Sequence, residues 1–554
     1  MTSDNPDVLI VGGSTVGLMT ALFLARSGVS ARIVERRPAP PTHPRAMGVG
    51  PRTVEILRTA GLADAVDAVC MDMSAGNLQM ISAPTLAEAD LENLAREARP
   101  RTDAFGRLTP QSLRGTCPQG RLDTVVAEAA RGAGAHIEFG SELLSFEQDH
   151  EGVTARVRDA DGEREIRARY LVAADGARSA VRQALGIGTS GPGTLGDPLI
   201  SVLFQADLDD LTRGHTFITC DITNPQAPGG LLPVDGEGEW IYHFRYSPEA
   251  GERAEDFTPE RCAERIRRAV APAADLALDI VSILPWRVSG LVADRLRAGR
   301  VFLAGDAAHV IPPVGAFGMN TGVADAHNLA WKLAHVLAGT AGEALLDTYE
   351  AERLPVARTA LTQSMLRLND PSLHWASGPE GRSHRARHGA LNAPVVHLGY
   401  RYDSTAVIGA RPELPSTEDV EAGLDGTPGS RLPHRWLLRD GADVSTLDLV
   451  DYRFTLLTGP GGQAWLDALG KATAQLGLAV DAHTVEDDRA ADDPSGTWTA
   501  QVGIEESGAV LVRPDGFVGW RATALEPEPD RVLTRVLGAL LGRPEPGPSP
   551  DSHE

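Results

Sequence analysis

The chain is poor in cysteine and in aromatic side chains. Only four of its 554 residues are cysteines, and phenylalanine, tryptophan and tyrosine together make up 5%. The cysteines are too far apart in sequence to suggest a disulfide framework or a zinc site. The sequence therefore predicts no disulfides and no bound metal. The four cysteines are Cys70, Cys117, Cys220 and Cys262.

Positive charge is also scarce. The chain has 52 Lys and Arg against 75 Asp and Glu, a formal net charge of -23. Such a charge disfavours nucleic acid and anionic membrane surfaces as partners. No apolar run is long enough to cross a membrane, and the N-terminus leads almost directly into an apolar strand without a basic region or a cleavage signal. We therefore expect a cytoplasmic protein, a monomer or homodimer, that acts on small molecules.

The first motif is a strand, a glycine turn, a helix and a second strand over residues 7–36. Its turn reads GGSTVG, and the second strand, Ala31 to Val34, ends on Glu35. Turn glycines, a helix N-terminus for a pyrophosphate and an acid about 20 residues further on are the dinucleotide fingerprint. The fingerprint asks for glycine where this chain has Ser14. That serine either crowds the pyrophosphate or donates its hydroxyl to it.

A second motif covers residues 299–332. A buried strand from Val301 to Ala304 leads to Asp306, and a loop rich in proline and glycine follows. Asn320 and Thr321 are candidate N-caps of a long helix. A carboxylate at a strand end suits ribose-type hydroxyls, and the N–H groups at a helix N-terminus suit a negatively charged ring.

A third motif follows Arg169. The strand Leu171 to Ala174 ends at Asp175-Gly176, and a helix opens between Ser179 and Arg182. Asp175 either contacts a ligand or organises the turn.

These three motifs, in this order, resemble the flavin-binding motifs of the group A FAD-dependent aromatic hydroxylases, which have the p-hydroxybenzoate hydroxylase fold. The stretch GGSTVGLMTALFLARSGV, together with HPRA, is most similar to hydroxylases of anthracycline- and tetracenomycin-type antibiotic pathways. The resemblance implies non-covalent FAD, with O₂ and NADPH or NADH as co-substrates. It implies a monooxygenase that hydroxylates a phenolic or quinonoid polycyclic aromatic of polyketide type through a flavin C4a-hydroperoxide.

Three other functions remain alternatives at this point. One is a Baeyer–Villiger oxygenase on the same scaffold. The second is a flavin dehydrogenase or isomerase, and the third is a non-enzymatic flavoprotein.

The resemblance also implies roles for single residues. Arg45 is expected at the FAD phosphates and Gln119 at the ribityl and phosphate groups. The backbone of the loop Pro313, Val314 and Gly315 is expected to border the reacting ring and to offer carbonyls to a phenol. The residues expected to bind FAD are Gly12, Gly13, Ser14, Thr15, Val16, Gly17, Glu35, Arg36, Arg45, Gln119, Asp175, Asp306, Pro313, Gly315, Gly318, Met319 and Asn320.

Alternating apolar residues from Leu199 to Leu284 predict an antiparallel sheet, with a helix through Ile266 and Val270. In the family this sheet forms the roof of the substrate pocket. Five apolar residues either line that pocket or belong to the sheet's core, and the sequence does not separate the two. They are Val202, Phe204, Leu232, Trp240 and Tyr242.

We therefore expect an α/β fold: a Rossmann-like FAD-binding domain with an inserted mixed or antiparallel β-sheet domain, plus a thioredoxin-like C-terminal domain. The C-terminal domain has no cysteine and is expected to stabilise the enzyme without taking part in the chemistry. A polar stretch near 370–390 is expected to be a linker. The expected ranges are 1–75, 105–185 and 288–370 for FAD, 76–104 and 186–287 for substrate, 392–541 for the thioredoxin-like domain, and 542–554 for a disordered tail.

Overall fold

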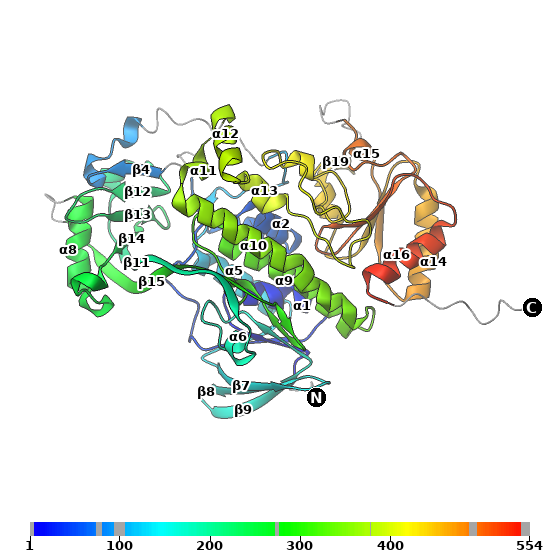
Figure 1. Cartoon of the computed structure of the whole chain (residues 1–554), viewed down its shortest axis with the longest axis horizontal. Helices are drawn as coiled ribbons and strands as arrows, with labels where there is room; N and C mark the ends of the chain where they lie inside the picture. Colours follow the sequence, from blue (N-terminus) through cyan, green and yellow to red (C-terminus); the bar gives the residue numbers. More distant parts are fainter. Residues whose placement is uncertain are drawn as a thin grey trace, which may run out of the picture.

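The computed structural model describes residues 5–73, 80–93, 106–271, 276–376, 378–486 and 496–543. Figure 1 shows a central α/β body. A β-sheet packed with α8 lies on one side of this body, and a C-terminal domain lies on the other side. The long helices α9 (Phe317–Leu337) and α10 (Asp347–Asn369) cross the middle of the molecule. From residue 544 onward, the predicted disordered tail lies outside the described residues.

The body is built on a six-stranded sheet in the order β16-β17-β10-β1-β2-β6. All neighbours are parallel except β16 and β17. Helix α1 (Thr15–Arg26) packs against α5 (Gln119–Gly132) and α9. The strand bounds are Val8–Val11 (β1), Ala31–Glu35 (β2), His136–Phe139 (β6), Tyr170–Ala173 (β10), Arg297–Ala298 (β16) and Val301–Leu303 (β17).

The parallel register brings the three sequence motifs to one edge of this sheet. Val11 pairs with Ala173 on one side and with Val34 on the other, and Ala173 pairs with Leu303. The residues that follow these strand ends therefore meet at the carboxyl edge, where ligands bind in open α/β sheets.

The second sheet has seven strands in the order β18-β15-β11-β14-β13-β12-β4. It confirms the predicted strands, but β4 pairs parallel with β12, so the sheet is mixed. Helix α8 (Pro259–Val270) covers one face. The strand bounds are Met80–Ala83 (β4), Thr189–Gln205 (β11), Thr219–Ile222 (β12), Gly229–Pro233 (β13), Glu239–Arg245 (β14), Asp279–Ala293 (β15) and His309–Val310 (β18).

The C-terminal domain has a four-stranded sheet in the order β22-β21-β23-β24. The first two strands along the chain are parallel and joined by α14, and a hairpin and α16 follow. This strand–helix–strand–hairpin–helix order confirms the thioredoxin-like prediction. The bounds are Thr455–Thr458 (β21), Gln463–Leu476 (α14), Asp481–Thr484 (β22), Ala509–Val512 (β23), Val518–Ala522 (β24) and Pro529–Leu540 (α16).

Smaller elements complete the described fold. A three-stranded antiparallel sheet precedes β10, and a hairpin precedes the C-terminal sheet. Their strands are Glu142–Gln148 (β7), Val153–Asp159 (β8), Gly162–Ala168 (β9), Trp436–Arg439 (β19) and Ala442–Ser445 (β20). The remaining pieces are Pro51–Thr59 (α2), Ala63–Ala68 (α3), Met71–Asp72 (β3), Gly115–Thr116 (β5), Ala180–Ala184 (α6), Asp209–Thr212 (α7), Ala393–Leu398 (α13) and Trp498–Gln501 (α15).

The prediction of a linker near residues 370–390 is wrong. The segment contains α11 (Ser372–Trp375) and α12 (Gly378–His388), and α11 packs against the end of α10. Arg385 of α12 forms a buried salt bridge with Glu418, at 2.6 Å. Ion pairs hold Arg385 and His384 of this segment, whereas Arg382 and Arg387 are exposed.

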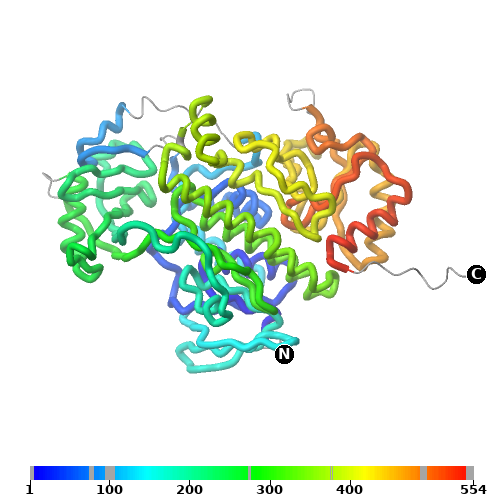
Figure 2. The backbone as a smooth tube through the Cα atoms, viewed as in Figure 1, coloured from blue at the N-terminus to red at the C-terminus, as the bar shows by residue number. Residues whose placement is uncertain are grey.

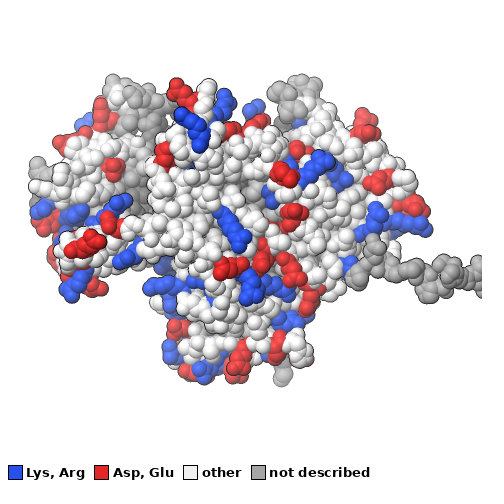
Figure 3. All heavy atoms as spheres, in the orientation of Figure 1, with Lys and Arg blue, Asp and Glu red and all other residues white. Residues whose placement is uncertain are grey.

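No helix in the described part of the chain is long and apolar enough to cross a membrane. Figure 2 traces the chain from the body into the second sheet, back through the central helices, and finally into the C-terminal domain. Acidic and basic side chains lie interspersed on the face that Figure 3 shows.

Candidate active site

The β1–α1 turn needs glycine at two positions. Gly12 has φ +111°, and a Cβ atom there would lie 2.2 Å from the carbonyl oxygen of Ala174. A Cβ on Gly17 would lie 1.9 Å from the carbonyl oxygen of Gly12. Ser14 is the N-cap of α1, but its side chain accepts no capping hydrogen bond. The first amides of α1 are therefore available to an anion.

Glu35 lies beside this turn. Its Oε2 accepts a hydrogen bond from the amide of Gly13 at 2.8 Å, and its Oε1 accepts one from Arg37 Nε at 2.9 Å. Burial raises the pKa of Glu35, but these hydrogen bonds outweigh burial and hold the pKa below its usual value. Arg36, which the sequence proposed for the cofactor, is exposed. Arg37, which the sequence analysis missed, is the arginine that pairs with the acid.

Ser14 is engaged with a buried carboxylate. Its hydroxyl donates to Asp123 Oδ2 at 2.8 Å, and the Thr15 hydroxyl donates to Asp123 Oδ1. Gln119 Nε2 donates to both hydroxyl oxygens, at 3.0 and 3.1 Å. Sequence analysis missed Asp123, although it lies one helical turn after Gln119. Because its single proton goes to Asp123, the hydroxyl of Ser14 has no second proton to donate to a phosphate.

Asp175 organises the turn and keeps one acceptor unused. Its Oδ2 accepts a hydrogen bond from the amide of Val181, in the first turn of α6, at 3.1 Å. Its Oδ1 is buried and has no hydrogen-bond partner among the described residues. A buried acceptor of this kind calls for a donor from a bound group.

Asp306 follows β17 at the same edge. Its side chain is reachable by solvent, yet protein surrounds it closely enough that desolvation raises its pKa, while His309 and Arg45 lower it. The guanidinium of Arg45 feels the charges of Arg37, Asp306, Glu35 and Arg178, and its pKa is lowered chiefly by desolvation. Arg45 thus lies among both carboxylates and other arginines at the carboxyl edge.

The long helix starts earlier than the sequence indicated. It begins at Phe317, with Ala316 as a left-handed N-cap at φ +56°, so the prediction of Asn320 or Thr321 as N-cap is wrong. The side-chain oxygen of Asn320 accepts from the amide of Gly50, at 2.7 Å, and its nitrogen donates to the carbonyl of Gly48, at 3.0 Å. The two left-handed residues, Gly315 and Ala316, turn the chain into the helix early and leave Asn320 to hold the 48–50 segment.

This helix start leaves Gly318 and Met319 in the first turn of α9, both half-buried. The loop before it is fixed by α10. Ser364 Oγ lies within hydrogen-bond distance of the carbonyl oxygens of Pro312, at 2.9 Å, and Val314, at 3.1 Å, and its one proton is shared between them. The carbonyl of Pro313 accepts from the amide of Ala316 at 3.2 Å. Each of these carbonyls keeps only one lone pair for another donor.

Four of the five residues proposed for the substrate lie on the wrong face of the second sheet. Their side chains are almost completely buried in the cluster between the sheet and α8, so they are core residues, the other interpretation that the sequence allowed. They are Val202, Phe204, Trp240 and Tyr242. Leu232 lies on the opposite face, where it packs near Met47, Leu203 and Ile241.

The opposite face, which we call the inner face, is turned toward the segment that follows β2. His43, in that segment, contacts the hydroxyls of Ser201 at 2.7 Å and Ser282 at 2.6 Å. Burial, with a smaller contribution from Arg45, lowers the pKa of His43 to about 4. His43 is therefore neutral at pH 7, with one ring nitrogen donating and the other accepting.

Two buried nitrogen atoms on the inner face have no hydrogen-bond partner among the described residues: His243 Nδ1 and Trp286 Nε1. Their rings are in contact, with centroids 5.9 Å apart. The register of β11 and β14 places His243 on the inner face, because His243 is paired with Ser201, which contacts His43 on that face. Unpartnered buried polar atoms beside a ligand site are suited to polar groups of the ligand.

These features fit FAD. The glycine turn with free helix amides suits a diphosphate, Glu35 suits a ribose, and Asp306 suits a ribityl chain. The unused oxygen of Asp175 adds a buried acceptor at the same edge. Sequence reasoning identified these positions from local motifs alone.

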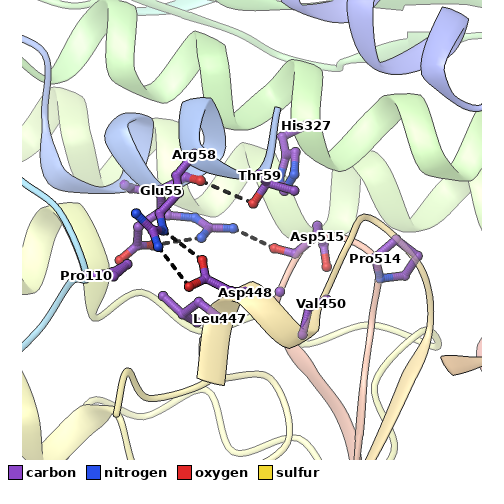
Figure 4. Close-up of a pocket in the computed structure, with 12 residues that line it drawn as sticks. Glu55, Arg58, Thr59, Pro110, His327, Leu447, Asp448, Val450, Pro514 and Asp515 are labelled. Atoms are coloured by element: carbon purple, nitrogen blue, oxygen red, sulfur yellow. Dashed lines mark hydrogen bonds and ion pairs between the residues drawn. The ribbon is translucent and has the colours of Figure 1, made fainter. Parts of the chain in front are cut away.

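A separate small cavity lies between α2, α9 and the C-terminal domain, as Figure 4 shows. Its volume is about 20 Å³, room for no more than a water molecule. Arg58, at its edge, pairs with Asp448 at 2.7 Å. This cavity lies at the contact between the α/β body and the C-terminal domain, and it is distinct from the site at the carboxyl edge.

Comparison with known families gives two matches. Residues 5–364 match the FAD binding domain family, and residues 425–544 match the C-terminal domain of aromatic-ring hydroxylases. Together these matches cover most of the chain.

Several known proteins are similar along nearly the whole chain. A putative polyketide hydroxylase of Streptomyces halstedii is 44% identical over 545 residues, which is 96% of this chain and 97% of that protein. The tetracenomycin A2 monooxygenase-dioxygenase of Streptomyces glaucescens is 42% identical over 570 residues, 98% of each chain. The crystal structure of aklavinone-11 hydroxylase with FAD and aklavinone superposes with a TM-score of 0.82 at 37% identity, covering 98% of this chain and 100% of that one.

Proposed function

The chain belongs to the FAD-dependent aromatic-ring hydroxylases, and we propose that it hydroxylates a phenolic or quinonoid polycyclic aromatic of polyketide type, with O₂ and NADPH or NADH as co-substrates. One observation carries the proposal: the segment with His43 and Arg45 connects the carboxyl edge to the inner face. His43 contacts Ser201 of the inner face, and Arg45 feels the charges of Glu35 and Asp306. The carboxylates of the carboxyl edge suit the cofactor, and the unpartnered nitrogen atoms of the inner face suit the oxygens of a phenol or quinone.

Bound FAD supplies electron transfer from the nicotinamide and delivery of one oxygen atom of O₂ to an electron-rich ring. The chain's own residues position and enclose the reactants. The first amides of α1 hold the diphosphate, with Arg45 as a further phosphate contact. Asp306 holds the ribityl hydroxyls, and the first turn of α9, with Gly318 and Met319, stabilises negative charge on the ring.

The inner face orients the substrate. His243 Nδ1 and Trp286 Nε1 pair with its oxygens, and Leu232 contacts its apolar rings. Neutral His43, fixed between Ser201 and Ser282, holds the segment before Arg45 against the sheet. The loop Pro313–Gly315 borders the reacting ring and keeps water out.

A direct assay tests this function. The purified protein is expected to be yellow, to release FAD on acid precipitation, and to be reduced by NADPH or NADH. A polycyclic phenol of anthracycline or tetracenomycin type should accelerate reduction and yield a product heavier by one oxygen atom. If an aromatic acceptor is reduced without consumption of O₂, the hydroxylase proposal is wrong.

The two faces of the sheet should respond differently to truncation. Leu284, opposite Ser201 on the inner face, and Val202, on the α8 face, are the matched pair. Leu284→Ala is expected to raise the substrate KM several-fold while the melting temperature changes little. Val202→Ala is expected to destabilise the fold by about 1–2 kcal/mol without changing KM, because it removes core methyl groups. An unchanged KM in Leu284→Ala would contradict this assignment of faces.

FAD affinity is expected to depend on pH through Asp123. Burial raises the pKa of Asp123 to about 6, although the Thr15 and Ser14 hydroxyls lower it, so the carboxyl gains a proton as the pH falls from 8 to 6. An ionised carboxylate beside the α1 N-terminus opposes a diphosphate, and protonation removes that repulsion. FAD should therefore bind about fivefold or more tightly at pH 6 than at pH 8.

The variant Asp123→Asn should bind FAD equally at both pH values, measured by fluorescence titration of the apoprotein. Glu128→Gln, an exposed position on the same helix, is the control and should keep the wild-type dependence. Equal pH dependence in Asp123→Asn and the wild type would assign the effect to another group.

The remaining features of the proposal concern organisation. We propose the division 1–75, 105–185 and 288–370 around FAD, 76–104 and 186–287 around the substrate, and 392–541 for the C-terminal domain. The enzyme acts in the cytoplasm as a monomer or a homodimer.

A further inference from the structure

A cluster of two histidines and one aspartate lies where the end of α10 meets α12, separate from the residues assigned to FAD and substrate. Asp370 follows the last residue of α10, and His384 and His388 lie on α12. In Figure 1, α11 and α12 project above α10, at the edge of the molecule. No step of the hydroxylation proposed above uses these side chains.

The three side chains offer ligand atoms that all lie within 4.8 Å of one another. His384 Nε2 is 2.8 Å from Asp370 Oδ2, and the two imidazole rings have centroids 4.5 Å apart. The histidines are four residues apart on one helix, which places them on the same face. Zinc–ligand bonds of about 2.0–2.2 Å would draw these atoms together by small side-chain rotations.

Neighbouring groups already orient two of the three side chains as in a metal site. His388 Nδ1 is 2.9 Å from the carbonyl oxygen of His384, so it donates and leaves Nε2 as the free coordinating atom. Asp370 Oδ1 accepts hydrogen bonds from Ser372 Oγ at 2.6 Å and from its amide at 3.1 Å, which leaves Oδ2 directed at His384. A second ring nitrogen that donates to a backbone carbonyl is the usual support of a histidine ligand.

We propose that Asp370, His384 and His388 bind one divalent transition-metal ion, Zn²⁺ in particular. Imidazole nitrogens favour zinc, nickel and copper over magnesium and calcium, which prefer oxygen ligands. On binding, the metal takes the place of the proton between His384 Nε2 and Asp370 Oδ2, and the neutral His384 ring then carries its one proton on Nδ1. Three protein ligands leave the fourth position of a tetrahedral zinc to water.

The site acts as a clamp between two helices. Asp370 directly follows the last residue of α10, whereas both histidines lie on α12. One bound ion would therefore link the two helices. Cysteine spacing predicted no metal in this chain. The spacing of His384 and His388 alone does not predict a metal site, because the third residue, Asp370, is distant in sequence and comes close to them only in the folded chain.

The proposal is tested on the full-length protein after treatment with a chelator. Zn²⁺ titrated by calorimetry is expected to bind at one ion per chain, and Co²⁺ is expected to give the visible absorption of a four-coordinate site. Zn²⁺ should also raise the melting temperature. His388→Ala and Asp370→Asn are each expected to weaken Zn²⁺ binding by about tenfold or more, with FAD content and circular dichroism unchanged.

The matched control is His150→Ala, an exposed histidine outside the cluster, which should bind Zn²⁺ as the wild type does. Three results would overturn the proposal. They are a lack of stoichiometric binding at micromolar Zn²⁺, equal binding by His388→Ala and the wild type, and loss of binding in His150→Ala.

Discussion

Replacing Arg513 with methionine is expected to destabilise the protein by about 3–5 kcal/mol, because it leaves buried carboxylates without their partner. Arg513 is fully buried in the C-terminal domain. Its guanidinium donates to both oxygens of Glu352 in α10, at 2.6 and 2.8 Å, and to Asp515 Oδ2 at 2.6 Å. Lys332 of α9 is the other cation at Glu352, at 2.7 Å.

The measurement is urea unfolding followed by circular dichroism, with stability read from the midpoint and slope. Arg531→Met is the matched control, because Arg531 and its partner Glu528 are both largely exposed, at 78% and 63% of their side chains. That control should leave the midpoint unchanged. If Arg513→Met unfolds at the same urea concentration as the wild type, the network contributes no net stability.

The same contacts indicate what a truncation near residue 390 would expose. The structure shows that removing the C-terminal domain leaves Lys332 and Glu352 without Arg513 and Asp515, and exposes the face of α9 around Trp331. We therefore expect the truncated chain to aggregate when expressed alone.

A second set of buried contacts connects the C-terminal domain to the carboxyl edge of the first sheet. Asp325 in α9 accepts a hydrogen bond from the amide of Gly305 at 3.1 Å and pairs with Arg353 at 2.8 Å. Arg353 in turn donates to the hydroxyl of Tyr402 at 3.1 Å. The C-terminal domain thus supports the turn before Asp306 through two helices, and we predict no direct role for it in the chemistry.

Replacing Asp306 with alanine is expected to lower FAD affinity by about tenfold or more while the protein stays folded. A hydrogen bond to a charged group is worth about 1.5–3 kcal/mol, which corresponds to that factor. Asp306 is suited to this role because its carboxylate is reachable from solvent at the end of β17, whereas its neighbours Gly305 and Ala307 are buried.

The measurement is the dissociation constant of FAD from the apoprotein, by quenching of flavin fluorescence. Asp161→Ala, in the exposed turn between β8 and β9, is the control and should bind FAD as the wild type does. Asp306→Asn, which keeps one acceptor oxygen, should fall between the two. Wild-type affinity in Asp306→Ala with a normal circular dichroism spectrum would remove Asp306 from the FAD site.

Local motifs were enough to predict which strand ends and turn glycines meet at the carboxyl edge, because the requirements of that edge are local. Gly12 and Gly17 are required by contacts of 2.2 and 1.9 Å that any Cβ would make. Glu35, Asp175 and Asp306 each lie at or just after the end of a buried parallel strand, and parallel strands present those ends on one side. The alternation of the second sheet and the order of the C-terminal elements were predictable for the same reason.

The faces of that sheet could not be assigned in the same way. A period of two separates the side chains into two sets. The set opposite α8 mixes apolar residues, such as Leu203 and Ile241, with polar ones, such as Ser201, so the pattern does not say whether that set faces solvent or a ligand. The structure decides this through α8 on one face and His43 and Met47 on the other.

The sequence by itself determined the fold class, the cofactor and the strand ends proposed to hold it, because strand ends and turn glycines obey short-range steric rules. Only the tertiary structure decided the partners that come from distant segments: Asp123 for Ser14, 109 residues away, and Glu352 for Arg513, 161 residues away. A side chain's environment in a folded protein is set by elements packed against it from elsewhere in the chain. No local pattern records which elements those are.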